Sequence, residues 1–270
     1  MSKITVGLPP NFSPLLCKQK NWEKIECQIE QHKKHTYNIT TVGPFFFLNP
    51  TNKKNYPFMI FLPNYIPEAL PKKSNRCTIS LNFPKSIPSI TFLSSKDDLI
   101  KEMYEYIVNS KSEMTIFLNS VKISECINSN YFEQFCENYS KPIKVISSVQ
   151  FMGGKWKLQT LYKDQPKELK TITIESPNVI ALPCYEVPHK FGSNENVINS
   201  FVIISKTESS PIYFKTPEID EMIKWILFLY AYLNNSPNTI GLPFSHIQAV
   251  SNKQVPSNQS QPVKPLSPKP

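Results

Sequence analysis

A short strand that runs directly into a helix, over residues 211–235, constrains the fold of this chain more than any other stretch. Residues 212–214 are β-branched or aromatic and favour a strand. Thr216 supplies an N-cap hydroxyl, and Pro217 occupies the first helical position, where its missing N–H is not needed. Acidic residues follow at the positive end of the helix. The sequence therefore predicts a helix that closes one end of a β-structure.

The predicted helix has one apolar face. The members of this face recur at helical spacing and are Ile219, Met222, Ile223, Ile226, Leu229, Tyr230 and Leu233. Trp225 and Leu227 flank the face, whereas Phe228 points to the opposite side. We therefore expect the helix to plug its own domain through a single face.

An earlier segment, residues 90–110, repeats this construction. Phe92 corresponds to Phe214, at an offset of 122 residues, and a capped apolar helix follows in both places. The earlier helix has Glu102 where the later one has Trp225. A strand and helix that recur in the same arrangement indicate an internal repeat.

Segments with β character fill the rest of both halves. Alternating apolar residues predict strands over residues 22–30, 36–42, 45–48, 58–62, 77–83, 90–93, 142–151, 155–162, 169–174, 179–182 and 197–205. In the first of these, the expected inward residues are Trp22, Ile25, Cys27 and Ile29. New β-like character begins at residues 115–118, and a short helix is expected over residues 129–139. Gly153-Gly154 predicts a tight hairpin turn.

Size and composition suit a large soluble chain with a tail. A length of 270 residues allows one large domain or two of ordinary size. Six cysteines stand far apart without a CxxC pair, which favours reduced thiols and no metal site. Neither a signal peptide nor an apolar run long enough to span a bilayer is found, so a cytoplasmic location is expected. Residues 236–270 are rich in Pro, Ser, Asn and Gln and predict a disordered tail.

The second half of the chain resembles a pleckstrin homology (PH) domain. The matching text is KELKTITIESPNVIAL, then SFVIIS, then IYFKTPEIDEMIKWILFL, with Trp225 at the position of the family's structural tryptophan. The first half resembles the same family through the order of its elements. The resemblance implies a mainly β fold: tandem antiparallel sandwich or barrel domains, each closed by a C-terminal capping helix. The implied organisation is an N-terminal extension (1–21), a PH-like domain (22–110), a connector with a short helix (111–141), a second PH-like domain (142–235) and the tail (236–270).

The resemblance also implies a set of lipid-headgroup residues. Many PH-like domains bind phosphoinositides through basic residues on their first two strands and the loop between them. In the second half the nearest positions are Lys144, Lys155 and Lys157, the last of which departs from the family's arginine and lacks its bidentate fork. In the first half, Lys33 and Lys34 lie on the corresponding loop, with Lys24 behind them. The net charge of +9 suits an anionic partner, although lysines that are dispersed over the surface and merely solvated are the favoured explanation.

No group of residues indicates catalysis or a cofactor. The histidines of the HKKH segment, His32 and His35, are separated by lysines that repel a cation, so a solvated turn is favoured over a metal site. Nucleic acid is a disfavoured partner, because Trp156 on an alternating strand faces away from Lys155 and Lys157 and enters the core. Two PxxP units in the tail could dock an SH3-type domain as polyproline II, or the tail carries no ligand.

Two functions follow as hypotheses. The first is a non-enzymatic signalling adaptor that associates with anionic phospholipid, including phosphoinositide, at the inner face of a membrane. The alternative is a protein-interaction scaffold that uses the PH-like surfaces and the tail without lipid. Many members of this fold bind proteins instead of lipid, so the fold alone does not choose between them.

Overall fold

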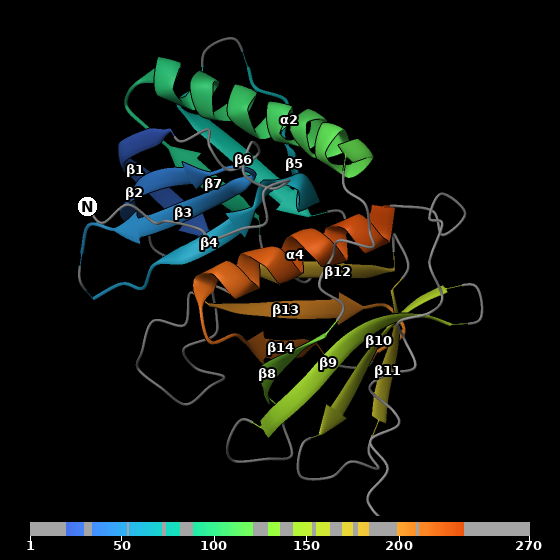
Figure 1. The fold of residues 1–270 in the computed structure, drawn as a ribbon. Helices are drawn as coiled ribbons and strands as arrows, with labels where there is room; N and C mark the ends of the chain where they lie inside the picture. The colour runs from blue at the N-terminus through green and yellow to red at the C-terminus, as the bar shows by residue number, and fades with distance from the viewer. Residues whose placement is uncertain are drawn as a thin grey trace, which may run out of the picture.

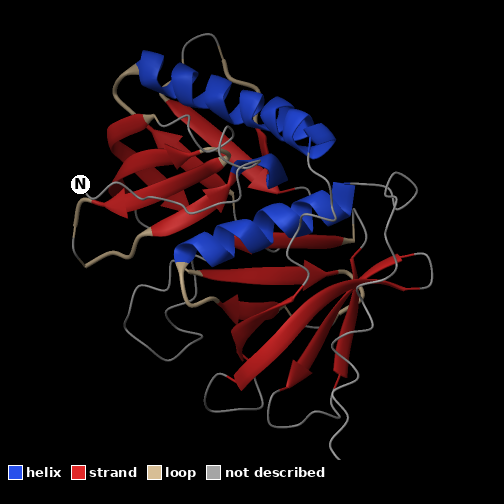
Figure 2. Ribbon diagram, viewed as in Figure 1, coloured by secondary structure: helices blue, strands red, loops and turns tan. Residues whose placement is uncertain are grey.

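Two seven-stranded antiparallel sheets, each followed by a long helix, make up the computed structural model of this protein (Figures 1 and 2). The expected fold class, mainly β with helices that follow the sheets, is confirmed. The structure describes residues 20–29, 34–52, 54–71, 74–81, 89–120, 129–135, 143–152, 155–162, 169–174, 178–183, 199–208 and 211–234. Residues 1–19 of the expected N-terminal extension, the tail, Gly153-Gly154 and Lys33 lie outside these residues, whereas Lys20 and Asn21, also expected in the extension, are described and β1 begins at Asn21.

Among the described residues, the first half contains seven strands, a 3-10 turn and a helix. Its elements are β1 (Asn21–Ile29), β2 (His35–Val42), β3 (Phe45–Pro50), β4 (Phe58–Phe61), η2 (Leu62–Asn64), β5 (Tyr65–Pro67), β6 (Arg76–Leu81), β7 (Ile90–Leu93) and α2 (Asp97–Ser120). The spatial order of the strands is β4-β3-β2-β1-β7-β6-β5. Pairing of β1 with β7 therefore joins a four-stranded meander to a three-stranded one.

The second half has the same plan. Its elements are β8 (Ser129–Phe135), β9 (Ile143–Met152), β10 (Lys155–Tyr162), β11 (Leu169–Ile174), β12 (Val179–Pro183), β13 (Ser200–Ser205), β14 (Ile212–Lys215) and α4 (Ile219–Asn234). Their order, β11-β10-β9-β8-β14-β13-β12, is that of the first half when each strand number is raised by seven. The internal repeat indicated by the two strand–helix units thus extends over the whole of both sheets.

Corresponding residues hold corresponding places in the two sheets. Phe92 of β7 pairs with Cys27 and Cys77 on its two neighbouring strands, and Phe214 of β14 pairs with Gln134 and Phe201 on its own. All six side chains are buried. The backbone repeats as well, because the Ser94 N–H donates to the Asn75 carbonyl at 3.0 Å and the Thr216 N–H donates to the Asn199 carbonyl at 2.9 Å.

Two local predictions around the connector are wrong. The short helix expected over residues 129–139 is strand β8, which pairs with β9 on one side and with β14 on the other. Two ladders of hydrogen bonds outweigh the weak local helix preference of this segment. The β-like character expected at residues 115–118 is also absent, because α2 continues through them to Ser120. Met114, just before them, is fully buried in the core of the second half, so packing favours continuation of the helix.

α4 is buried on more than the one face expected of it. Phe228, predicted to point away from the apolar face, is fully buried in the same hydrophobic cluster as Trp225. That cluster also contains Phe45 and Phe61 from the first half. Figure 1 shows α4 between the two sheets, where the Asn64 side-chain amide donates to the Ala181 carbonyl of β12 at 2.9 Å. The helix is therefore covered by both halves, as expected of a helix that is hydrophobic all round.

Candidate functional site

One end of the first sheet gathers three chain segments that connect its strands. Ile29, at the end of β1, pairs with Ile90, at the start of β7, and Cys27 pairs with His35, at the start of β2. Leu48, near the end of β3, pairs with Phe58 at the start of β4. Connections β1–β2, β3–β4 and β6–β7 therefore emerge together. The turn at Gly43 lies at the opposite end, under α2, where the Tyr106 hydroxyl donates to its carbonyl.

Side-chain and backbone contacts hold the β3–β4 connection against β2. Asn55 Nδ2 lies 3.1 Å from His35 Nδ1. The Thr51 N–H and its hydroxyl both donate to the Thr36 carbonyl, at 3.0 and 3.1 Å. Asn52 Oδ1 accepts the Lys54 N–H at 3.0 Å and so forms a compact turn. The β3–β4 connection is consequently held against the first residues of β2, beside Lys34.

This surface carries exposed lysines, and we call it the basic end, defined by Lys34, His35, Lys54, Asn55 and Tyr56. Lys34 and Lys54 are both exposed, and each is adjacent in sequence to a partner of the His35–Asn55 contact. Each also follows a second lysine in the sequence, within the segments HKKH and NKKN. Lys34 Nζ lies 3.9 Å from Glu26 Oε2 in an exposed ion pair, which is too weak and too screened to cancel its charge.

Lys24 lies behind the basic end, as the sequence predicted, on a β-bulge. Its backbone is left-handed, with φ of 55°, and its N–H donates to Asn38 Oδ1 at 3.1 Å. The bulge adds one residue between Trp22 and Ile25, so both side chains face inward although they are three positions apart. Lys24 is exposed, at the level of Asn38 and roughly 10 Å along β2 from His35.

The lysines predicted in the second half do not converge. Lys155 pairs with Met152 at one end of the β9–β10 hairpin, whereas Lys144 lies beyond the Val145–Tyr162 pair at the other end. Lys155 is opposite Met152, which is eight residues along β9 from Lys144, so the two lysines are separated by roughly 25 Å along the strands. Lys157 lies near Lys155 on the same face of β10, and Trp156 between them is buried, as predicted.

Strand β8 was not predicted, so the predicted lysines of the second half lie one strand later in the sheet than expected. β8 is the first strand there, so Lys144 lies on the second strand and Lys155 and Lys157 on the third. The connection between the first two strands is residues 136–142, outside the described residues. Lys144 is moreover directly opposite Glu133, which is also directly opposite Lys215 on its other side. A carboxylate between two lysines lowers the positive potential of that face.

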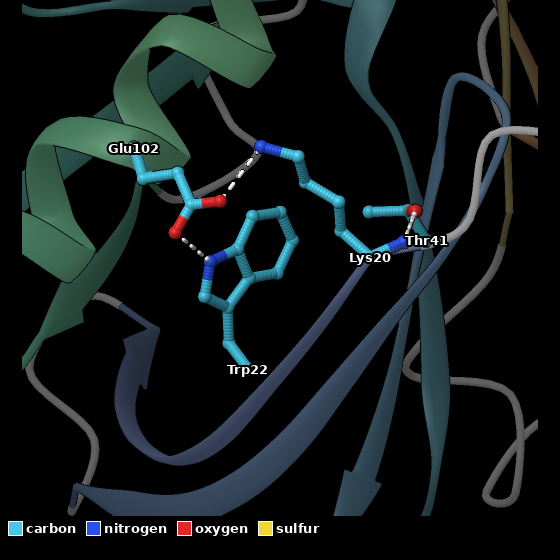
Figure 3. A network of polar contacts seen from close by, with 4 residues as sticks. All are labelled: Lys20, Trp22, Thr41 and Glu102. Carbon is cyan, nitrogen blue, oxygen red and sulfur yellow. Dashed lines mark hydrogen bonds and ion pairs between the residues drawn. The ribbon is translucent and has the colours of Figure 1, made fainter.

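Glu102, which corresponds in the internal repeat to Trp225, accepts a hydrogen bond from a tryptophan of another element. Figure 3 shows its carboxylate between Lys20 and the indole of Trp22. Lys20 Nζ lies 2.7 Å from Glu102 Oε1, and Trp22 Nε1 donates to Oε2 at 3.3 Å. The hydrogen bond from Lys20, and secondly that from Trp22, holds the pKa of Glu102 below its ordinary value. This contact joins β1 to α2, so its role is structural, like that of the buried Trp225 in the second half.

Other reactive groups are buried or dispersed. Cys27 and Cys77 are free, and burial raises the pKa of each thiol to about 12. Within the described ranges, no three His, Cys, Asp or Glu side chains lie close enough together to hold a metal ion. Among those same residues, no helix is long and apolar enough to cross a membrane. The basic end is thus the site on which a functional proposal can rest.

Comparison with known proteins adds no family assignment. No protein-family model matches the chain, and no curated protein matches its sequence. Inferences about function therefore rest on its residues and their geometry.

Proposed function

We propose that this protein is a non-enzymatic adaptor with two PH-like domains, which associates with anionic membrane lipid through the basic end of its first half. Two features support the PH-like assignment: each half has seven antiparallel strands, and each is followed by a helix. The basic end lies at the end of the sheet away from the Gly43 turn and α2, where the connections β1–β2 and β3–β4 meet. In this it corresponds to the surface that many PH-like domains use for phosphoinositides.

The contact between His35 and Asn55 is the observation that carries the proposal. It brings together two segments that each contain a pair of lysines. Each lysine near an anionic leaflet contributes about 1 kcal/mol of attraction, so several on one surface are needed for measurable binding. Clustering of this kind distinguishes the first half from the second, in which Lys144 faces Glu133 and is far from Lys155.

Sedimentation with lipid vesicles tests the proposal. We expect the full chain to bind vesicles of phosphatidylcholine with phosphatidylserine or a phosphoinositide at low salt, and to lose binding at high salt because screening shortens the range of the attraction. Lys34→Gln with Lys54→Gln should weaken binding roughly thirtyfold, since two lysines are removed. The matched control, Lys155→Gln with Lys157→Gln, changes charge by the same amount and should bind like the original protein. Equal losses in both double variants, or no binding at low salt, would overturn the proposal.

A protein-interaction scaffold is the second candidate. It is favoured by two exposed apolar side chains, Ile66 on β5 and Val108 on α2, which belong to elements that contact each other. This function predicts capture of a protein partner without lipid, and loss of that capture in Ile66→Ser or Val108→Ser. A partner captured equally by both variants argues against these surfaces. The predicted docking of an SH3-type domain to the tail stays a prediction, to be tested separately by deletion of residues 236–270.

A further inference from the structure

An exposed aromatic ring lies within the basic end. Among the described residues, the exposed large hydrophobic side chains are Tyr56, Ile66 and Val108, and Tyr56 is 39% exposed. Tyr56 directly follows Asn55, whose side chain contacts His35, and is two residues after the exposed Lys54. Tyrosine combines an apolar ring with a polar hydroxyl, a combination that favours the interface between water and lipid.

We propose that Tyr56 is an interfacial anchor, whose ring enters the headgroup region of an anionic bilayer while Lys34 and Lys54 contact lipid phosphates. This inference rests on the proposed function and deepens it, because it commits the basic end to a bilayer surface and not to a soluble phosphate compound. A soluble polyphosphate would be attracted by the lysines alone. A bilayer offers phosphates to the lysines and an apolar layer to the ring beside them.

The backbone around Tyr56 favours insertion at low entropic cost. The turn at Asn52 and the contact between Asn55 and His35 fix the segment before it. Phe58, two residues later, begins β4 and is buried. Because the backbone on both sides of Tyr56 is already fixed, only the torsions of its side chain lose freedom on binding. The remaining exposed hydrophobics, Ile66 and Val108, belong to β5 and α2 and so do not extend this patch along the β3–β4 connection.

A tryptophan placed at position 56 would report insertion directly. The three tryptophans of the chain, Trp22, Trp156 and Trp225, are all buried. In the full-length Tyr56→Trp variant, the new indole therefore dominates any change in emission caused by vesicles. We expect a blue shift and protection from acrylamide quenching with phosphatidylcholine/phosphatidylserine vesicles at low salt. Neither change is expected with phosphatidylcholine alone or with inositol hexakisphosphate.

Two further variants complete the test. Val108→Trp places an indole at another exposed apolar position and should show no blue shift with the same vesicles. Tyr56→Ser should weaken sedimentation with anionic vesicles roughly tenfold through loss of apolar burial. Thermal unfolding followed by circular dichroism establishes that each variant is folded.

The outcomes separate this inference from the proposed function. Binding to anionic vesicles without a blue shift at position 56, or with an equal shift at position 108, would overturn the anchor while leaving electrostatic association intact. An equal shift with inositol hexakisphosphate would also overturn it, since the bilayer would then be unnecessary. Failure of the original protein to sediment with anionic vesicles would overturn both.

Discussion

Tyr230 and Tyr232 of α4, only two residues apart, contact opposite halves of the protein. The Tyr230 ring packs edge-on against Phe61 of β4, with centroids 5.3 Å apart, and the Tyr232 ring packs against Trp156 of β10 at 4.6 Å. Residues that are two positions apart in an α-helix point about 200° away from each other, so the two rings lie on nearly opposite sides of the helix. α4 is therefore a shared core element, and the two halves should unfold as one unit.

Phe61→Ala tests this coupling. Phe61 is fully buried in the cluster that contains α4. Its truncation should lower the free energy of unfolding by about 3 kcal/mol, because a large cavity forms between the halves. Urea unfolding should remain a single transition by both circular dichroism and tryptophan fluorescence. The control Ile66→Ala, at an exposed position, should change stability by no more than about 0.5 kcal/mol. Two separate transitions in the original protein would contradict the shared core.

Glu102 should make a small contribution to the free energy of unfolding, and this contribution should disappear at acidic pH. Hydrogen bonding from Lys20 lowers the pKa of Glu102 in the folded protein below its value in the unfolded chain. The contribution is therefore present above the unfolded pKa and is lost as pH falls through the folded pKa. Because Lys20 and Glu102 are both substantially exposed, the effect should be about 0.5 kcal/mol. Glu102→Gln should be less stable by this amount at pH 7, and the difference should vanish in acid. A difference that persists unchanged in acid would contradict the ionic origin.

The buried thiols should destabilise the protein in alkali. Burial raises the pKa of Cys27 from its usual value of about 9 to about 12. Stability from the neutral thiol is fully present below the unfolded pKa and is lost as pH rises towards the folded pKa. We expect the slope of unfolding free energy against pH, between about 9 and 12, to be shallower in Cys27→Val. The native thiol should also resist alkylation at pH 8. Rapid native labelling of Cys27 would show that its burial is not maintained.

The sequence predicted the strand–helix unit that closes each half better than it predicted contacts between distant segments. Phe92 and Phe214 were correctly matched in the internal repeat because a short strand that leads into an apolar helix is a local signal. β8 was missed because its residues pair with β9 and β14, and such long-range ladders leave little trace in seven residues. The burial of Phe228 was missed for a related reason. The sequence indicates a single apolar face on this helix, and the burial of its other sides depends on long-range packing in the cluster that contains residues of both halves.

The positions of the candidate lysines relative to the strands were predicted correctly only in the first half. Lys34 was placed correctly because it lies in a short polar connection between two clear strands, whereas the partner segment with Lys54 is brought to it by the contact between Asn55 and His35. No spacing in the sequence encodes that contact. In the second half, the unrecognised strand β8 moved Lys144 and Lys155 one strand further along the sheet. An error in counting strands thus assigned these lysines to the wrong strands.

Substitutions of Lys24 can separate the effect of its backbone conformation on stability from the effect of its charge on lipid binding. Its left-handed backbone, with φ of 55°, disfavours a side chain that has a Cβ atom, and glycine adopts this conformation freely. Lys24→Gly should therefore be neutral or stabilise the fold by up to about 1 kcal/mol, whereas Lys24→Val should destabilise it by about 1–2 kcal/mol. Urea unfolding measures both. If the lysine contributes its charge to the basic end, Lys24→Gly should nevertheless bind anionic vesicles several-fold more weakly than the original protein. A glycine variant that is both less stable and unchanged in vesicle binding would show that the lysine serves the bulge and not the membrane surface.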